Sequence, residues 1–292
     1  MKKTMLIKGL MLMTMCLSVS SVWAQMPRCH YTNEDSVTIV TLLQKGPRPL
    51  LDYAREFLGC PYVAHTLELY PDDERLVLNT RELDCTTYVD VVVALTLCAQ
   101  RGETTFEAFV RQLHQQRYWG GVCNGYPSRI HYFSDWIRDN TLLGFVKEVQ
   151  TPNPPFTAVQ TVKVDYMSSY PDKYVSLSRH PEYVPTIRQQ EEDLTGRQFR
   201  FIPTKDVKNT RAMRNAVHDG DILAITSSNP HLDIAHLGIA VWHDDGLYMI
   251  DASSRLKKVV EEKMSMRQYL ERRSDASGIR VVRLAEGTLR LR

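Results

Sequence analysis

Three residues whose side chains can together perform nucleophilic catalysis stand far apart in this 292-residue sequence: Cys85, His236 and Asp251. A thiolate attacks a carbonyl carbon when an imidazole manages its proton and a third polar group orients that imidazole. Because the partners in such a site are neighbours in space, their separation along the chain is no objection. The combination therefore predicts covalent acyl-transfer chemistry at Cys85.

Cys85 is predicted to lie in the first turn of a buried helix. Asp84 can cap this helix, and an almost wholly apolar run follows as far as Ala99. The unpaired N–H groups and the dipole of a helix start favour the thiolate form of a cysteine. A cysteine in an apolar helix is more often a small core residue, and that interpretation suits Cys98.

His236 is predicted to open one strand, and Asp251 lies in the next strand of the same hairpin. If the turn centres on residues 244–245, Trp242 pairs with Leu247, and Asp251 falls on the face of His236, one diagonal step away. A one-residue change in the loop would put Asp251 on the opposite face. In that case Asp251 would be a plain turn residue. The alternative for His236 is a core histidine whose hydrogen bonds are satisfied within the fold.

Around these residues the sequence predicts helices first and strands afterwards. Apolar periodicity and capping residues predict helices over 33–44, 50–58, 84–99, 105–113 and, capped by Ser128, 129–138. Short β-branched runs predict antiparallel strands at 221–226, 237–242, 247–250 and 279–284. Gly238 is expected to leave space for a helix N-terminus beside His236. Residues 150–215 show little pattern beyond a helix within 181–194, so one α+β domain with insertions is favoured over two domains.

Residues 1–24 are predicted to be a cleaved signal peptide, with residues 25–292 forming the single domain. A basic start, a short apolar centre and the small residues Val22 and Ala24 support cleavage over a membrane anchor. Cleavage would remove three lysines and no acidic residue from totals of 36 and 34, leaving the chain close to neutral. Neither nucleic-acid binding nor a membrane span after cleavage is indicated. We therefore expect a periplasmic or exported protein.

Five cysteines would remain after cleavage: Cys29, Cys60, Cys85, Cys98 and Cys123. Disulfides are allowed in an oxidising compartment, but an odd count leaves at least one free thiol unless dimers form. The sequence has neither a CxxC pair nor an HExxH motif, so no metal or other cofactor is expected.

Four motifs resemble, in order, the signature of the NlpC/P60 cysteine hydrolases of cell-wall peptidoglycan. They are Gly59-x-Pro61-Tyr62, Asp84-Cys85-x-x-Tyr88-Val89, the stretch 235–240 and the stretch 250–254. The longer context, including residues 66–68, 128–136 and 220–222, resembles the DUF1460 branch of N-acetylmuramoyl-L-alanine amidase-like proteins. Two departures are Thr86-Thr87, where the superfamily usually has Ser-Gly, and Asp251, where many members have histidine.

The resemblance implies a papain-like NlpC/P60 core, in which a helical N-terminal half packs on a C-terminal antiparallel sheet. It implies Cys85 as the nucleophile, His236 as the base and a third polar residue, here Asp251, that orients the base. The implied reaction is hydrolysis of the amide bond between N-acetylmuramic acid and L-alanine in small muropeptides, including 1,6-anhydro forms.

Three further residues are candidates for substrate binding. The resemblance implies that Tyr62 lines the site, although a tyrosine after proline is often only a packing residue. Arg129 and His131 are the other candidates, and a capped amphipathic helix explains them nearly as well.

Three alternative functions remain open, and no oligomeric state is predicted. The chain could be an endopeptidase that cuts γ-D-glutamyl bonds of the stem peptide, or a muropeptide-binding protein without catalysis. The coexistence of Cys85, His236 and a carboxylate disfavours the second. A transglutaminase-like Cys-His-Asp enzyme would share the triad but not the Pro61-Tyr62 and Asp84-Cys85 contexts.

Overall fold

The computed structural model describes residues 27–285, so the predicted signal peptide lies outside the described residues. The helices are α1 (Asn33–Leu43), α2 (Leu50–Arg55), α3 (Cys85–Gln100), α4 (Phe106–Arg117), α5 (Phe133–Leu142), α6 (Tyr166–Ser169), α7 (Val175–Arg179), α8 (Val184–Leu194), α9 (Arg211–Ala216) and α10 (Met266–Glu271). The strands are β1 (Cys29–His30), β2 (Leu76–Val77), β3 (Val146–Val149), β4 (Ala158–Thr161), β5 (Gln198–Pro203), β6 (Ile222–Ser227), β7 (Ile234–Trp242), β8 (Leu247–Ser253), β9 (Lys258–Glu261) and β10 (Ala276–Leu284). Within residues 27–285, every helix falls short of the length and apolarity needed to cross a bilayer.

One large antiparallel sheet organises the second half of the chain. Its strand order is β4-β5-β10-β6-β7-β8-β9, and β3 also pairs with β10. Every pairing within it is antiparallel. The four strands predicted from the sequence are β6, β7, β8 and β10, so the predicted antiparallel sheet is confirmed. The sequence did not predict β3, β4, β5 and β9, which extend that sheet on both sides.

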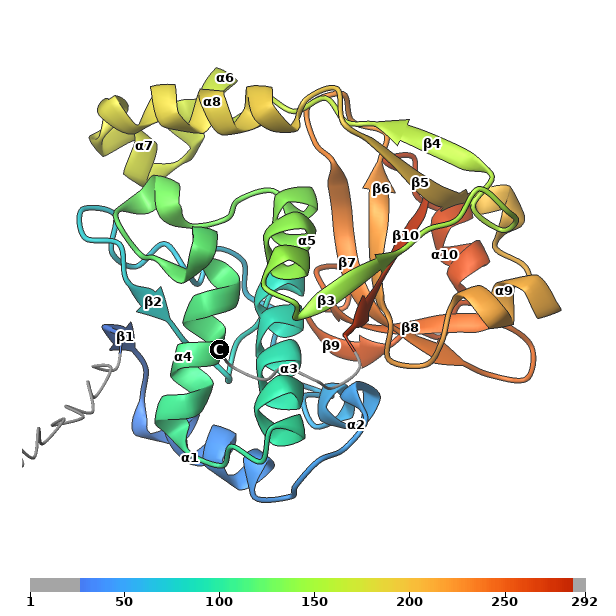
Figure 1. Cartoon of the computed structure of the whole chain (residues 1–292), viewed down its shortest axis with the longest axis horizontal. Helices are drawn as coiled ribbons and strands as arrows, with labels where there is room; N and C mark the ends of the chain where they lie inside the picture. The colour runs from blue at the N-terminus through green and yellow to red at the C-terminus, as the bar shows by residue number, and fades with distance from the viewer. Residues whose placement is uncertain (1–26, 286–292) are drawn as a thin grey trace, which may run out of the picture.

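Helices cover both faces of this sheet (Figure 1). On one face, the apolar side of α3, including Val92, packs in the same cluster as Ile239 of β7. On the other face, Met213 of α9 and Met266 of α10 pack with Ile225 of β6. Successive side chains of a strand point to opposite faces, which is why β6 and β7 contribute to both clusters and read as nearly continuous apolar runs.

Threonine hydroxyls cap two helix starts, at the predicted residue in α4 and one residue before the predicted Asn33 in α1. The Thr105 hydroxyl accepts a hydrogen bond from the Ala108 N–H at 3.2 Å and begins α4 where predicted. At α1 the cap is Thr32, because its hydroxyl accepts from the Asp35 N–H and the Asp35 carboxylate accepts from the Thr32 N–H at 2.8 Å. Such a reciprocal pair satisfies two otherwise unbonded N–H groups at a helix start.

The helix predicted over 129–138 begins later, at Phe133. The Ser128 hydroxyl does not cap a helix here, because it accepts from the Asn124 N–H at 2.8 Å and donates to the Gly125 carbonyl at 2.6 Å within the preceding turn. Residues 129–131 are extended instead, and the Ile130 N–H donates to the Arg117 carbonyl at 2.9 Å. The prediction of a Ser128 cap was therefore wrong, and the start of α5 needs an acceptor from elsewhere in the chain.

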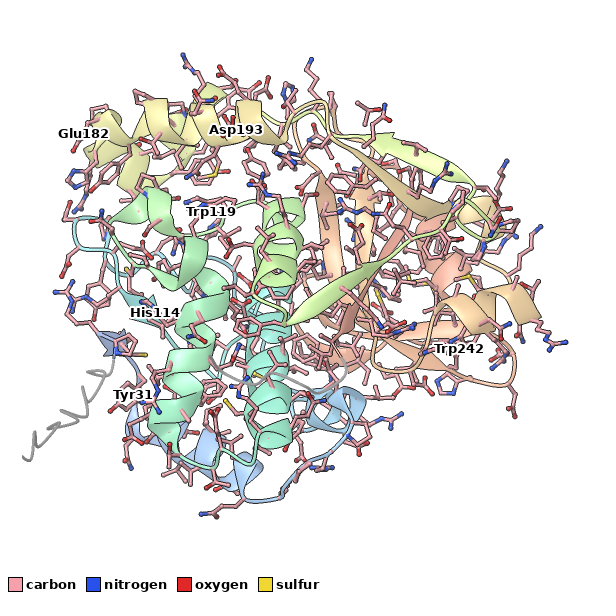
Figure 2. All side chains as sticks on the ribbon, viewed as in Figure 1. Tyr31, His114, Trp119, Glu182, Asp193 and Trp242 are labelled. Carbon is pink, nitrogen blue, oxygen red and sulfur yellow. The ribbon has the colours of Figure 1, made fainter. Side chains whose placement is uncertain are left out.

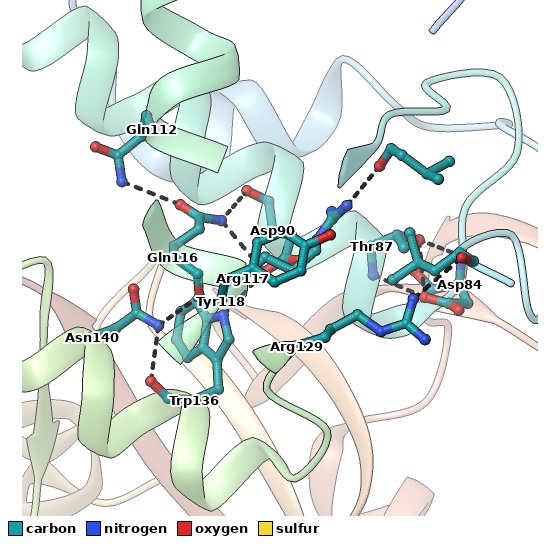
Figure 3. Close-up of polar contacts among 12 residues, drawn as sticks. Asp84, Thr87, Asp90, Gln112, Gln116, Arg117, Tyr118, Arg129, Trp136 and Asn140 are labelled. Carbon is teal, nitrogen blue, oxygen red and sulfur yellow. Dashed lines mark hydrogen bonds and ion pairs between the residues drawn. The ribbon is translucent and has the colours of Figure 1, made fainter. Parts of the chain in front are cut away.

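A buried polar network joins α3, α4 and α5 (Figure 3). The Asp90 carboxylate of α3 accepts from Arg117 Nε at 2.8 Å and from Trp136 Nε1 at 3.0 Å. Arg117 also donates to the Val77 carbonyl of β2 at 2.6 Å. Each partner satisfies a group that would be costly to bury alone, so the network fixes how the three helices pack.

The segment that the sequence left without a clear pattern forms an insertion, seen across the top of Figure 1 as α6, α7 and α8. Glu182 and Asp193 mark its outer side in Figure 2. Its anchor is the buried Glu191 carboxylate of α8, which accepts from the Tyr132 hydroxyl at 2.6 Å and from the Met167 N–H at 2.9 Å. The insertion is thereby tied to the segment that leads into α5.

Candidate active site

Cys85 is the first residue of α3, as predicted, and it is partly exposed. The cap is Asp84, whose Oδ1 accepts from the Thr87 N–H at 2.8 Å, while the Thr87 hydroxyl accepts from the Asp84 N–H at 2.9 Å. The first N–H groups of a helix have no acceptor within the helix. Asp84 accepts the hydrogen bond of the Thr87 N–H. The N–H groups of Cys85 and Thr86 remain available beside the thiol.

The β7–β8 hairpin has the register that the sequence predicted. Trp242 pairs with Leu247, and Ile239 pairs with Ile250. This register brings the His236 and Asp251 side chains together, with 2.6 Å between Nε2 of the ring and Oδ2 of the carboxylate. Asp251 is fully buried, so its hydrogen bond fixes the orientation of the imidazole.

The other side of the His236 ring faces Cys85, and the two side chains are hydrogen-bonded. Burial opposes protonation of the ring, but the negative charge of Cys85 and the hydrogen bond to Asp251 outweigh burial and raise the pKa of His236 to about 10. The structure therefore brings Cys85, His236 and Asp251 into one chain of hydrogen bonds. The arrangement provides a nucleophile, a proton carrier and a group that orients the carrier.

Gly238 does not make room for the start of α3, in contrast to the prediction from the sequence. A Cβ atom at this position would lie 2.8 Å from Met249 Sδ and 3.2 Å from the Ile250 carbonyl oxygen, both on β8. The glycine instead permits the close approach of β7 and β8 beside the His236–Asp251 pair.

Tyr62 lies beside Cys85. Its N–H donates to the Lys257 carbonyl at 2.9 Å, and its backbone pairs with that of Leu83, two residues before Cys85. Burial, followed by the charges of Cys85 and Asp84, raises the pKa of Tyr62 to about 12. Its hydroxyl therefore keeps its proton at neutral pH and can donate a hydrogen bond.

Arg129 joins the segment before α5 to the loop of residues 67–74. Its guanidinium donates to Glu68 Oε1 at 2.5 Å and to the Leu67 carbonyl at 3.2 Å, and it lies 3.7 Å from a Glu74 oxygen. The side chain is buried and packs over the Tyr126 ring. These contacts give Arg129 a structural role, because its donors are engaged by the loop of residues 67–74.

His131 lines a cleft that opens at Cys85 and His236, with a volume of about 140 Å³. The His131 ring packs against that of Tyr126 in a tilted arrangement, and its Nε2–H donates to the Tyr126 carbonyl at 3.1 Å. Burial, followed by the charge of Arg129, lowers the pKa of His131 to about 3. The ring is therefore neutral, and its position beside the thiol fits the predicted substrate-binding role better than that of Arg129 does.

Three cleft residues were missed by reasoning from the sequence. Met167 and Tyr174 come from the insertion, and Asp233 comes from the segment before β7. The first two stand in a stretch without a helical or strand period, so no sequence signal singled them out. Asp233 could have been suspected only from its position three residues before His236.

Residues 52–279 match the model of the AmiA-like family, described as N-acetylmuramoyl-L-alanine amidase-like. The chain belongs to the AmiA-like family. The matched residues include Tyr62, Cys85, His236 and Asp251, so the whole hydrogen-bonded chain lies within the family region. No curated protein matches the sequence.

Solved structures support this family assignment. An N-acetylmuramoyl-L-alanine amidase from Bacteroides uniformis is 38% identical, with a TM-score of 0.75, over 82% of this chain and 98% of its own. A Bacteroides fragilis protein, described provisionally as a xylanase, is 37% identical, with a TM-score of 0.74, over 80% of this chain and 99% of its own. A Legionella pneumophila protein of family DUF1460 shares the fold at 20% identity, with a TM-score of 0.67, over 87% of this chain and 95% of its own.

Proposed function

We propose that this AmiA-like protein is a cysteine amidase with a papain-like NlpC/P60 core. Its substrate is a small muropeptide, and it hydrolyses the amide bond between the lactyl group of N-acetylmuramic acid and L-alanine. The single observation that carries the proposal is the hydrogen-bonded chain of Cys85, His236 and Asp251 at the start of α3. The family membership supports the amide as the bond.

In the first step, the Cys85 thiolate attacks the lactyl carbonyl carbon and forms a C–S bond. The carbonyl oxygen becomes an oxyanion. The N–H groups of Cys85 and Thr86 at the start of α3, together with the Tyr62 hydroxyl, are the donors available to stabilise it. Because these donors are fixed before the reaction begins, they favour the charge that develops in the transition state.

The tetrahedral intermediate then collapses to a thioester, and the C–N bond breaks. His236, held in its protonated form beside Cys85, gives its proton to the nitrogen of the departing L-alanine. In the second half, neutral His236 takes a proton from water, and the resulting hydroxide attacks the thioester. Muramic acid leaves with a free carboxylate, and Cys85 returns as the thiolate. No metal or organic cofactor takes part in this mechanism.

Export to the periplasm or beyond is part of the proposal, because cell-wall fragments are found there and residues 1–24 have the pattern of a signal peptide. Intact wall is a poorer candidate than a small fragment. The cleft at Cys85 has a volume of about 140 Å³ and is lined on one side by Met167 and Tyr174 of the insertion.

Two other hydrolytic functions have to be weighed against the amidase. A γ-D-glutamyl endopeptidase would use the same three residues, and only the products distinguish it. A xylanase, the activity named for the Bacteroides fragilis structure, needs two carboxyl groups on either side of a glycosidic bond. Among the described residues that line the cleft, Asp233 is the single carboxylate, which disfavours glycoside hydrolysis.

Two non-hydrolytic alternatives are also less favoured. A muropeptide-binding protein would not need His236 hydrogen-bonded to both Cys85 and Asp251. A transglutaminase-like enzyme would share the triad, but the family match supports an amidase.

Digestion of purified reducing and 1,6-anhydro muropeptides, followed by mass analysis of the products, tests the proposal. We expect free stem peptides that begin with L-alanine. Products cut after D-glutamate would replace the amidase with the endopeptidase, and xylo-oligosaccharide cleavage without muropeptide turnover would support the glycosidase.

A further inference from the structure

Asp233 is a carboxylate on the wall of the cleft, three residues before His236. Only 3% of the residue is exposed. Its Oδ2 accepts from the Ser134 N–H of α5 at 2.7 Å, and its backbone carbonyl accepts from Gln160 Nε2 at 2.7 Å and from the Ser227 N–H at 3.0 Å. The contacts from β4 and β6 therefore fix the backbone of Asp233, and the contact from α5 orients its carboxylate, before any ligand arrives.

The second carboxylate oxygen of Asp233 has no partner in the part of the chain that the structure describes. Within residues 27–285, the hydrogen bond that reaches the carboxylate ends on Oδ2, and no lysine, arginine or histidine forms an ion pair with Asp233. A buried carboxylate without a cation is unfavourable unless its oxygens are hydrogen-bonded. An unpartnered oxygen at the wall of the cleft is thus an acceptor that a bound molecule can use.

A β-bulge accompanies the unusual placement of Asp233. In a regular strand, residues three apart point to opposite faces, so Asp233 and His236 would be separated. Here Ile225 pairs with His236 and Thr226 pairs with Ile234, which leaves Ala235 as the extra residue. Bulges re-aim side chains next to active sites, and with this one both Asp233 and His236 line the same cleft.

His131 adds a second acceptor to this cleft. Because its Nε2–H donates to the Tyr126 carbonyl, the neutral ring carries its lone pair on Nδ1. A cleft with a fixed carboxylate and a neutral imidazole is suited to substrate groups that donate hydrogen bonds, and it disfavours a carboxylate at that point.

We propose that Asp233 is a specificity-determining residue whose Oδ1 accepts a hydrogen bond from a substrate amide N–H or hydroxyl next to the bond attacked by Cys85. The inference rests on the proposed function, in that it assigns part of the substrate to the same cleft. A role limited to capping α5 is the alternative, because Oδ2 already binds the Ser134 N–H.

The variant Asp233→Asn separates the two roles. Its amide oxygen can still accept from the Ser134 N–H, while an NH₂ donor replaces the acceptor that faces the cleft. With N-acetylmuramoyl-L-alanyl-D-isoglutamine as substrate, we expect kcat/KM to fall about 10- to 100-fold, mainly through KM, which is the range for a lost hydrogen bond to a charged group. The thermal midpoint and the rate of Cys85 alkylation by iodoacetamide should stay unchanged.

Asp135→Asn is the matched control, because Asp135 is a buried carboxylate at the same helix start that does not line the cleft. Its kcat/KM should stay within about twofold of wild type, below the effect of one hydrogen bond. The proposal is overturned if Asp233→Asn has wild-type kinetics, or if it slows alkylation of Cys85 as much as it slows hydrolysis.

Failure of the proposed function would show separately, as absence of hydrolysis by the wild-type protein. In that case, calorimetry of dipeptide binding tests the role of Asp233. It compares the single variant Cys85→Ala with the double variant that also carries Asp233→Asn. Weaker binding by the double variant supports the role of Asp233, and equal binding, or no binding by either protein, overturns it.

Discussion

The chemistry at the residue scale depends on the contacts of His236. Asp251 holds one ring nitrogen at 2.6 Å, and Cys85 is hydrogen-bonded to the ring as well. Burial alone would favour the neutral ring, but these two neighbours raise the pKa of His236 to about 10. The imidazole therefore carries a proton throughout the neutral range, next to the atom that would attack the substrate.

A pH profile tests this assignment. In the wild-type protein, kcat/KM for muropeptide hydrolysis should fall as the pH rises through about 10, because His236 then loses the proton that it gives to the leaving amine. Asp251→Asn removes an interaction that raises this pKa, so the alkaline limb should move to lower pH. The rate at pH 7 should fall by up to about 10⁴-fold, as when an orienting aspartate is lost from a triad.

The raised pKa of His236 also affects the stability of the fold. The folded-state pKa of His236 is raised, so its contribution to the free energy of unfolding is complete below the ordinary pKa of about 6.5. It is lost as the pH rises through about 10. Urea unfolding of wild type and Asp251→Asn between these pH limits measures this contribution to the free energy of unfolding. In the kinetic profile, an alkaline limb of kcat/KM that stays at the same pH in Asp251→Asn would contradict the assignment to His236.

The places of Cys85, His236 and Asp251 in the fold could be predicted from the sequence, because local rules determine them. A helix cap placed Cys85, and the period of two in a hairpin placed Asp251 beside His236. Arg129 and Asp233 show where such rules stop. Whether Arg129 faces a substrate or Glu68, and whether Asp233 lies in a loop or in the cleft, depends on segments far away in the sequence.

The most important element is the start of α3, because it positions both the Cys85 thiol and the N–H groups beside it. The Asp84–Thr87 capping box holds this turn in place. Helix starts could be predicted where the capping side chain is local, as for α3 and α4. The start of α5 could not, because its acceptor is Asp233, about a hundred residues later in the chain.

Asp84→Ala should lower the free energy of unfolding by about 1 kcal/mol, the usual effect of losing an N-cap. It should also lower kcat/KM, because the turn that carries Cys85 loosens. Thr105→Ala removes the cap of α4 and serves as the matched control, with a similar loss of stability and unchanged kinetics. Urea unfolding and steady-state kinetics measure both effects, and an equal loss of activity in the two variants would argue against a special role for the α3 turn.

At the scale of the whole molecule, the cleft is assembled from segments that are far apart: the start of α3, the stretch before α5, the insertion, and β7. Apart from α8, the insertion had no readable pattern, because α6 and α7 are only four and five residues long and β4 is the edge strand of the sheet. The antiparallel sheet and the helical layer could be predicted, but the cover of the cleft could not.

Glu191 is the anchor on which this cover depends, since its buried carboxylate accepts from Tyr132 and from the N–H groups of Met167 and Ser168. Glu191→Ala should lower the free energy of unfolding by about 1–3 kcal/mol, because buried donors lose their acceptor. It should also raise KM, while alkylation of Cys85 continues. The neighbouring Glu192 is exposed, so Glu192→Ala should change neither quantity. An unchanged KM in Glu191→Ala would show that the insertion does not shape substrate binding.

The central claim is that Cys85 is the nucleophile, and the turnover of purified muropeptides by Cys85→Ala tests it most directly. Circular dichroism and the thermal midpoint establish that the variant is folded, and Cys98→Ala controls for the loss of a buried thiol. We predict that release of stem peptides beginning with L-alanine falls on the order of 10⁴-fold or more in Cys85→Ala, as when a catalytic nucleophile is removed. Release at the wild-type rate by folded Cys85→Ala would contradict the mechanism.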